Sequence, residues 1–421
     1  MMLNEPVRDA FLPADDFFLA RQPILGRNQH LVAFELLFRS AGDVPEANVT
    51  DHAAATAAVI SHASQLGLQQ VVGERLAFVN VDDIVLMSDF VKFLPHEKVI
   101  LEILETVQAT PAVVARVIEL REYGFKFALD DVTADTPDVR KFIDLVDVIK
   151  VDVQAVPADK LASLAIALKR KNKKLLAEKV ETVEEFDICM ELGFDYFQGF
   201  YFARPVILSG KKIAPSELVI LNLLSLINSD ADNREVELAV KRDALISLNL
   251  LRLVNTPAAG VRGHIGSLAQ ALQVLGREQL QRWLQILLYA KPGAHAQFDS
   301  PLLQMATTRG KLMELMMVRV RPQQRSSAES AFSVGIMSLM DALLSMSMRD
   351  ILATVAVPPE VRVALLERGG QLGEMLQVVE LLENSRHGAE LGTLLKSLGI
   401  TVPEVRQVEL EAFSWVNQLV A

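Results

Sequence analysis

The stretch from Phe125 to Glu181 contains three short apolar runs that end in or carry acidic residues: FKFALDD (125–131), VIKVD (148–152) and LLAEKVE (175–181). Three similar runs precede it: LVAFELLF (31–38), LAFVN (76–80) and VILEILE (99–105). From Glu102 to Gln198 the runs recur at intervals of roughly 20 to 28 residues, about one strand, turn and helix. In a parallel barrel the carboxyl ends of the strands meet on one face, where the active site lies. The pattern therefore predicts an α/β barrel whose acidic residues converge at one end.

Amphipathic helical patterns lie between these runs. The candidate helices are residues 52–66, 110–123, 136–146, 157–172 and 182–193. Several of them begin with a proline near the first turn, which the fixed φ of proline favours. The main rival architecture is an open, doubly wound sheet, but the chain has no glycine-rich phosphate loop such as GxGxxG or GxxxxGKS. Strand–helix alternation without such a loop favours the barrel.

The chain changes character near the segment PVILSGKKIAP (205–215), whose glycine, serine, lysines and prolines are typical of a domain boundary. Beyond it, Leu, Met and Ala recur at helical spacing. The candidate helices there are residues 216–228, 233–240, 243–254, 267–274 and 277–291, with more after Ser300. We therefore expect a barrel domain in residues 1–207 and an all-α domain in residues 208–421.

Composition and charge narrow the class of protein. The chain has 421 residues, enough for two domains with sizeable cores, and 51% of them are hydrophobic. The net charge of −11 lies wholly in residues 1–207, which hold 32 acidic and 21 basic residues. Neither half has the positive excess of a protein that binds nucleic-acid polymers. We expect no membrane span and no signal peptide, and the single cysteine, Cys189, fits a reducing cytoplasm.

The polar residues near the strand ends form a set of hard oxygen ligands. The set consists of Glu35, Asn80, Glu102, Asp130, Asp131, Glu178 and Glu181. One such acid alone is most often a helix cap or a turn former, but a converging set repels itself unless metal ions neutralise it. Lys150 and Arg39 add positive charge for a phosphate or for a nucleophilic water. The combination favours Mg²⁺ or Mn²⁺ and the two-metal hydrolysis of a phosphodiester.

These motifs resemble those of the EAL-type cyclic di-GMP phosphodiesterase domain over about residues 17–207. The stretch ARQPILGRNQHLVAFELLFR (20–39) is similar to the opening of that domain, with Glu35-Leu36-Leu37-Phe38-Arg39 in place of its Glu-Ala-Leu-x-Arg signature. The further matching motifs, in order, are Asn80, Glu102-Ile103-Leu104-Glu105, Asp130-Asp131, Lys150-Val151-Asp152, Glu178-Lys179-Val180-Glu181 and Gln198-Gly199-Phe200. The resemblance implies a TIM-like barrel with one strand reversed.

The resemblance also assigns roles to single residues. Glu35, Asn80, Glu102 and Asp130 would bind a first metal ion, and Asp131 would serve a second, with contributions from Asp130 and Glu181. Glu178 and Lys150 would position and deprotonate the attacking water, so that cyclic di-GMP is opened to the linear pGpG. Gln22, Arg39, Asp152 and Gln198 would contact the substrate. Glu105 would anchor the loop that follows the aspartate pair.

Two departures from the family pattern bear on activity. The loop after the aspartate pair reads Val132-Thr133-Ala134-Asp135-Thr136-Pro137 and holds no glycine, although active members have a glycine-rich loop there that orders the second metal ion and a dimer contact. Leu36 and Lys179 replace an alanine and a glycine, and neither change removes a ligand. The complete ligand set favours a phosphodiesterase. The altered loop keeps two alternatives open, a non-catalytic receptor for cyclic di-GMP and a pure scaffold.

The second half resembles the HDOD domain, a helical relative of metal-dependent HD phosphohydrolases, over about residues 209–400. The resemblance rests on LLSLINSDADNREVELAVKRDALISLNLLRLVNTPAAG (223–260), IGSLAQALQVLGREQLQRWLQILL (265–288), AFSVGIMSLMDALL (331–344) and VRVALLERGGQLGEML (361–376). True HD enzymes need an adjacent His-Asp pair, which this chain lacks. The half is therefore expected to be a regulatory or interaction module that binds a protein partner, and the whole chain could form a homodimer.

Overall fold

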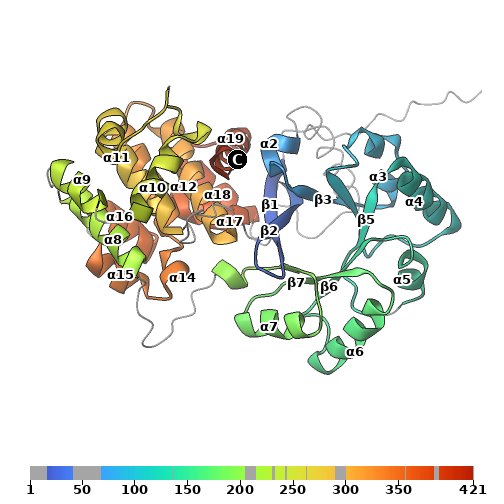
Figure 1. Cartoon of the computed structure of the whole chain (residues 1–421). Coiled ribbons are helices and arrows are strands. Elements are labelled where there is room, and N and C mark those ends of the chain that lie inside the picture. Colours follow the sequence, from blue (N-terminus) through green and yellow to red (C-terminus); the bar gives the residue numbers. More distant parts are fainter. Residues whose placement is uncertain are drawn as a thin grey trace, which may run out of the picture.

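The chain folds into two units that lie side by side, a closed barrel and a bundle of helices (Figure 1). The computed structural model describes residues 17–40, 68–134, 136–203, 215–229, 233–241, 244–261, 263–289, 300–355, 357–383 and 388–420. The expected domain boundary at residues 207 and 208 lies outside these ranges and stays a prediction.

Eight strands close the barrel in chain order. They are β1 (Phe17–Gly26), β2 (Leu31–Ser40), β3 (Leu76–Val81), β4 (Val99–Ile103), β5 (Lys126–Leu129), β6 (Val148–Asp152), β7 (Lys174–Glu178) and β8 (Tyr196–Gln198). Neighbours from β2 to β8 pair in parallel. Strand β1 runs antiparallel to both β2 and β8. The predicted TIM-like barrel with one reversed strand is therefore confirmed.

Short helices connect the strands on the outside of the barrel. They are α2 (Leu68–Val72), α3 (Asp83–Met87), η2 (Asp89–Phe93), α4 (Pro111–Tyr123), α5 (Pro137–Phe142), α6 (Ala158–Lys169), α7 (Val183–Glu191) and η3 (Tyr201–Ala203). Threonine side chains cap α4, α5 and α7 by accepting a backbone hydrogen bond. The helix expected at residues 136–146 ends earlier, at Phe142, and the chain continues to β6 through a turn in which the N–H groups of Leu145 and Val146 both donate to the Phe142 carbonyl. The candidate helix 52–66 lies outside the described residues.

The second unit is all-α in its described part. Its helices are α8 (Pro215–Asn228), α9 (Asn233–Lys241), α10 (Ala244–Val254), η4 (Pro257–Ala259), α11 (Leu268–Tyr289), α12 (Pro301–Val320), α13 (Arg325–Met337), α14 (Met340–Leu344), α15 (Met348–Thr354), α16 (Pro359–Glu367), α17 (Gly370–Glu383), α18 (Gly388–Leu398) and α19 (Val402–Val420). Gly276 breaks α11 with non-helical dihedrals, between the two helices that the sequence predicts there. No helix in the described ranges is both long enough and apolar enough to cross a bilayer.

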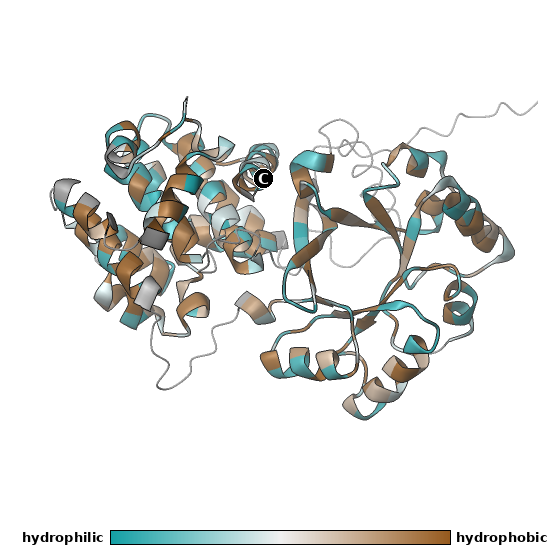
Figure 2. Ribbon diagram, in the orientation of Figure 1, coloured by the Kyte–Doolittle hydropathy of each residue, from teal (hydrophilic) through white to brown (hydrophobic). Residues whose placement is uncertain are grey.

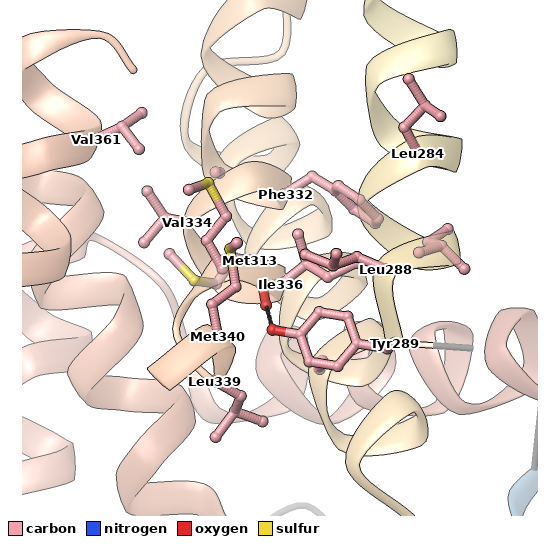
Figure 3. Packing of buried hydrophobic residues seen from close by; sticks show 14 of the residues in the cluster. Leu284, Leu288, Tyr289, Met313, Phe332, Val334, Ile336, Leu339, Met340 and Val361 are labelled. Atoms are coloured by element: carbon pink, nitrogen blue, oxygen red, sulfur yellow. Dashed lines mark hydrogen bonds between the residues drawn. The ribbon is translucent and has the colours of Figure 1, made fainter. Parts of the chain in front are cut away.

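Each unit has its own core, and hydrophobic residues follow most of the barrel strands (Figure 2). In the helical unit Phe332, Ile336 and Met313 pack together with residues of α11 (Figure 3). The hydroxyl of Tyr289 donates a hydrogen bond of 2.6 Å to the carbonyl of Ile336 and so satisfies the one polar atom of that buried ring. Many leucine and methionine residues of this half are buried core positions, whereas Leu218 and Leu248 are exposed.

Candidate active site

The barrel interior is built in two layers, because side chains two residues apart on a strand point to the same side. The lower layer is an apolar plug that contains Ile24, Ala33, Phe78, Ile100, Ala128, Val148 and Leu176, with Tyr196 packed against it. Two residues further toward the same end of the barrel, these strands carry Gln22, Glu35, Asn80, Glu102, Asp130, Lys150, Glu178 and Gln198. Seven strands, and Asp130 directly after β5, therefore contribute one polar residue each to the upper layer.

Lys150 lies at the centre of the upper layer. Its Nζ is 2.8 Å from Oε1 of Glu178, 3.0 Å from Oδ1 of Asp130 and 3.3 Å from Oε2 of Glu35. It also forms an ion pair with Glu102. The Lys150 side chain is 1% exposed and that of Glu102 is fully buried, so these charges interact with little screening by water. Four carboxylates from four strands thus surround one ammonium group.

Amide groups from neighbouring strands orient Glu35. Nε2 of Gln198 donates to Oε2 of Glu35 at 2.6 Å and to Oε1 of Gln22 at 2.9 Å. Nδ2 of Asn80 donates to Oε1 of Glu35 at 3.2 Å. The bonds to Glu35 on β2 thus come from β8 and β3, and Gln198 also connects β8 to Gln22 on β1. They fix the carboxylate in one orientation.

The carboxylates of this layer differ in pKa. Burial, with repulsion from Glu178 and Glu35, raises the pKa of Asp130 well above its usual value. Burial likewise raises the pKa of Glu178, although Lys150 opposes the rise. Burial acts on Glu35 as well, but Lys150 and the bonds from Gln198 and Asn80 outweigh it and lower the pKa of Glu35. Without a further cation the layer therefore holds more negative charge than it stabilises.

A second, more exposed cluster lies beside the first. Asp131 lies just after β5, Asp152 is the last residue of β6, and Lys179 comes directly after β7. Nζ of Lys179 donates a hydrogen bond to Oδ2 of Asp152 and lies 3.7 Å from Oδ1 of Asp131. The other oxygen of Asp152 accepts from the backbone N–H groups of Gln154 and Ala155. Both oxygens of Asp152 thus have protein partners.

The remaining predicted residues lie at the edge of the site. Glu105 is exposed after β4, and its charge contributes to raising the pKa of Asp130 and Asp131, for both of which burial is the main cause. The backbone N–H of Glu181 donates to Oε2 of Glu185 in the capping of α7, and its side chain is half-buried. The side chain of Arg39 lies outside the described part of the structure. The assigned roles of these three residues stay predictions.

The donor set fits a hard divalent cation. Carboxylate oxygens of Glu35, Glu102 and Glu178 lie within 4.8 Å of one another. Oε2 of Glu102 and Oε2 of Glu178 are buried and accept no hydrogen bond from the described residues. Unpaired buried carboxylate oxygens are costly unless a cation binds them. Oxygen ligands of this kind suit Mg²⁺ or Mn²⁺.

Comparisons with known proteins agree with this architecture. The family model described as EAL domain matches residues 5–205, and the model described as HDOD domain matches residues 215–348. The Vibrio cholerae protein "Cyclic di-GMP phosphodiesterase CdgJ" is 30% identical over 412 residues, which cover 96% of this chain and 94% of CdgJ. The chain belongs to the EAL–HDOD family. The predicted resemblance to both domains is thus confirmed.

Two further proteins are similar to this chain over nearly all or about half of its length. The Bacillus subtilis protein YuxH, described as uncharacterized, is 28% identical over 96% of this chain and 98% of YuxH. A solved structure of Klebsiella pneumoniae BlrP1, a complex with manganese and cy-diGMP, is 24% identical over 45% of this chain, with a TM-score of 0.37. The matched region spans little more than half of that structure, 56% of its length.

Sequence reasoning missed one residue of the EAL domain. It treated Lys179 as a neutral replacement, whereas Lys179 pairs with both carboxylates of the second cluster. The signal was present in the motif Glu178-Lys179-Val180-Glu181, where a positively charged residue stands between two acids that the sequence assigned to the site. The direction of its side chain depends on barrel closure and could not be read from the motif.

Proposed function

We propose that the EAL domain of this chain hydrolyses cyclic di-GMP to the linear dinucleotide pGpG, with a divalent cation, Mg²⁺ or Mn²⁺, bound among its buried carboxylates. The observation that carries the proposal is the imbalance around Lys150, where four carboxylates face one ammonium group. If all are ionised, the sum of −4 and +1 leaves three negative charges. A divalent cation would relieve this excess and supply a Lewis acid for a phosphodiester.

The similarity to CdgJ along nearly its whole length supports cyclic di-GMP as the substrate. The acidic first half gives no basic track for a nucleic-acid polymer. A small cyclic dinucleotide needs no such track, because a cation bound among the carboxylates can contact its phosphate directly. Gln22, Gln198, Asp152 and Arg39 remain the candidates for contacting the substrate.

The proposed reaction divides the upper layer by role. Glu35, Asn80, Glu102 and Asp130 would hold the cation, which supplies an activated water and polarises the phosphodiester. Glu178 would accept the proton of the attacking water, and burial suits it for this because it raises the pKa of Glu178 and so makes the carboxylate a stronger base. Lys150, bonded to Glu178, would orient that carboxylate and stabilise charge on the phosphate. Attack at phosphorus breaks the bond to the 3′ oxygen and leaves a 5′ phosphate on pGpG.

A pair of acidic variants tests this function. Glu35→Ala removes a proposed ligand and should lower the rate of pGpG formation by at least about a hundredfold, as loss of a central catalytic group does. Glu122→Ala removes an equally negative but exposed residue on α4 and should leave the rate unchanged. The rates are measured by chromatography of the nucleotides with Mg²⁺ or Mn²⁺ present. Equal rates for the two variants would contradict the assigned role of Glu35.

A second candidate function is that of a receptor that binds cyclic di-GMP without hydrolysing it. The loop Val132–Pro137 favours it, because this loop lacks the glycines of active members. In the structure Asp131 itself takes the left-handed conformation at the start of this loop, with φ of 47°. Calorimetric titration with cyclic di-GMP, with and without metal, would rule out the receptor if no binding is measured.

The helical half would act as a regulatory or interaction module. It has no His-Asp pair that could build a hydrolase centre. Helices α17 and α19 contact β1, the strand that carries Gln22. We infer that a protein partner of the helical half, or a second copy of the chain, would influence hydrolysis through this strand. Residues 1–207 and 208–421 are our proposed limits of the two domains.

A further inference from the structure

Lys179 places a fixed positive charge between Asp131 and Asp152. Its Nζ donates to Asp152 and lies 3.7 Å from Asp131. The three residues come from the carboxyl ends of β5, β6 and β7, next to the buried Lys150 layer. Counted as ionised groups, two carboxylates and one ammonium sum to −1, compared with −3 around Lys150. The second cluster is thus the better neutralised of the two.

The backbone of Lys179 is held in an uncommon conformation. Its φ is 55°, and it is one of six non-glycine residues in the described part with positive φ. Such a conformation is strained for a residue with a Cβ, because Cβ comes close to the carbonyl oxygen that follows it. The carbonyl of Lys179 accepts a hydrogen bond of 3.0 Å from Nε2 of Gln154. Gly199 packs so closely on Val180 that an added Cβ would lie 2.0 Å from the Val180 carbonyl oxygen. These contacts fix the segment that carries the Lys179 side chain.

Asp131 also has a positive φ, of 47°. The oppositely charged side chains of these two strained residues lie close together, across the ends of β5 and β7. Backbone strain that the fold maintains in this way is concentrated at functional sites. A structural role alone would not require the charged side chain, because glycine would relieve the strain at position 179.

We propose that the ammonium group of Lys179 takes the place of a second divalent cation at Asp131, so that the chain binds one metal ion tightly, among the carboxylates around Lys150. The inference rests on the proposed metal-dependent function and specifies its metal requirement. A divalent cation at Asp131 would meet the like charge of Lys179 within a few ångströms, and this repulsion lowers its affinity. Lys179 instead supplies one positive charge that is present at every metal concentration.

Counting bound metal tests the proposal without measuring turnover. Purified chain is freed of metal and titrated with Mn²⁺, with bound ions counted by calorimetry and the electron paramagnetic resonance of Mn²⁺. The unchanged chain should bind one ion with the spectrum of an isolated Mn²⁺. Lys179→Gly should also bind a second ion, with a dissociation constant at least about tenfold lower than that of any second ion in the unchanged chain. Its Mn²⁺ spectrum should then show the broadening of two coupled ions.

Matched variants separate charge from backbone effects. Lys179→Gln removes the charge but keeps a long side chain, and it should also gain the second ion, whereas Lys179→Arg keeps the charge and should not. Asn172→Gly relieves a similar positive φ of 55° away from the site, and Lys171→Ala removes an exposed lysine of the barrel. Both controls should bind one ion.

Three results would overturn the proposal. Two ions in the unchanged chain would refute it and leave the proposed hydrolysis intact. One ion in Lys179→Gly and Lys179→Gln would show that Lys179 does not exclude the second. No bound ion in any variant would remove the basis of the proposed metal-dependent function as well, so failure of the inference and failure of the function are distinguished.

Discussion

Lys150 is the counter-charge of the upper layer, buried among Glu35, Glu102, Asp130 and Glu178. Replacing it by methionine would leave these carboxylates without an ammonium partner. We expect Lys150→Met to lower the free energy of unfolding of the metal-free protein by about 3–5 kcal/mol, the usual cost of breaking a buried ion pair. Urea denaturation of the metal-free protein measures this change in the free energy of unfolding.

Added Mn²⁺ should stabilise Lys150→Met more than it stabilises the unchanged chain, because the cation restores the missing positive charge. Lys171→Met, at an exposed position, should change the free energy of unfolding by less than about 0.5 kcal/mol. Equal destabilisation by the two substitutions would contradict the central place of Lys150.

Asp130 should make the stability of the metal-free protein depend on pH. Because burial and neighbouring acids raise its folded pKa above the unfolded value of 3.8, the folded state holds this proton more tightly. The resulting stabilisation is complete below pH 3.8 and is lost as the pH rises through the folded pKa. Asp130→Asn removes the effect. In the presence of a chelator, Asp130→Asn should therefore become progressively more stable relative to the unchanged chain as the pH rises from about 4.5 to about 7.5.

Thermal or urea unfolding at several pH values measures this difference. Asp138→Asn, on the exposed first turn of α5, serves as the control and should show no comparable gain. A difference between Asp130→Asn and the unchanged chain that stays constant with pH would contradict the assignment.

The segment between β7 and α7 follows Glu178 directly and carries Lys179, and its position depends on Gly199. A Cβ at residue 199 would lie 2.0 Å from the carbonyl oxygen and 2.6 Å from the nitrogen of Val180, at a φ of 147°. Gly199→Ala must therefore displace this segment, and we expect a loss of about 3 kcal/mol or more in the free energy of unfolding and weaker Mn²⁺ binding.

Gly193→Ala is the matched control for Gly199→Ala. Gly193 also has a positive φ, of 87°, but an added Cβ would meet only the end of the flexible Lys169 side chain at 3.4 Å. It should cost about 1 kcal/mol and leave Mn²⁺ binding unchanged. Equal Mn²⁺ affinity in the two variants would show that the segment is not held by Gly199.

The sequence predicted most strands of the barrel because their apolar runs stand at regular spacing and end in acids. It also predicted the break between two helices near Gly276, where the structure interrupts α11. It could not predict the contact of Lys179 with Asp131, because that contact joins β5 to β7 through side chains whose directions follow from barrel closure. The helix predicted from the sequence extends beyond the true end of α5 at Phe142, because no proline or glycine follows Phe142 to mark the end of the helix.

The two units are joined through the outer face of the strands that carry the site. Arg21 on β1 points away from the barrel interior, next to Gln22, and Phe34 on β2 precedes Glu35. The guanidinium of Arg21 lies 4.4 Å from the ring centre of Phe34 and 4.2 Å from that of Phe413 on α19. It also bonds to Val71 and Asn417. The sequence could not indicate this contact, since Phe413 has the same helical spacing as a core residue.

Arg21→Ala should loosen both sides of this contact together. We expect faster hydrogen exchange in α19 and in β1, because one side chain connects them. Arg27→Ala is the control, since Arg27 bonds only to carbonyls of Met190 and Phe194 within the barrel among its described partners. It should speed exchange in the β1–β2 turn and leave α19 unchanged. Unaltered exchange in α19 after Arg21→Ala would contradict a coupling through this residue.

The central claim is that the carboxylates around Lys150 form a catalytic centre for cyclic di-GMP. A single-turnover reaction tests it most directly, with the full chain in excess over cyclic di-GMP, Mn²⁺ present, and the nucleotides separated by chromatography over time. The account predicts that cyclic di-GMP disappears in one phase and that pGpG is the first product. Recovery of unchanged cyclic di-GMP from protein that calorimetry shows to be saturated with it would contradict the claim and identify a receptor instead.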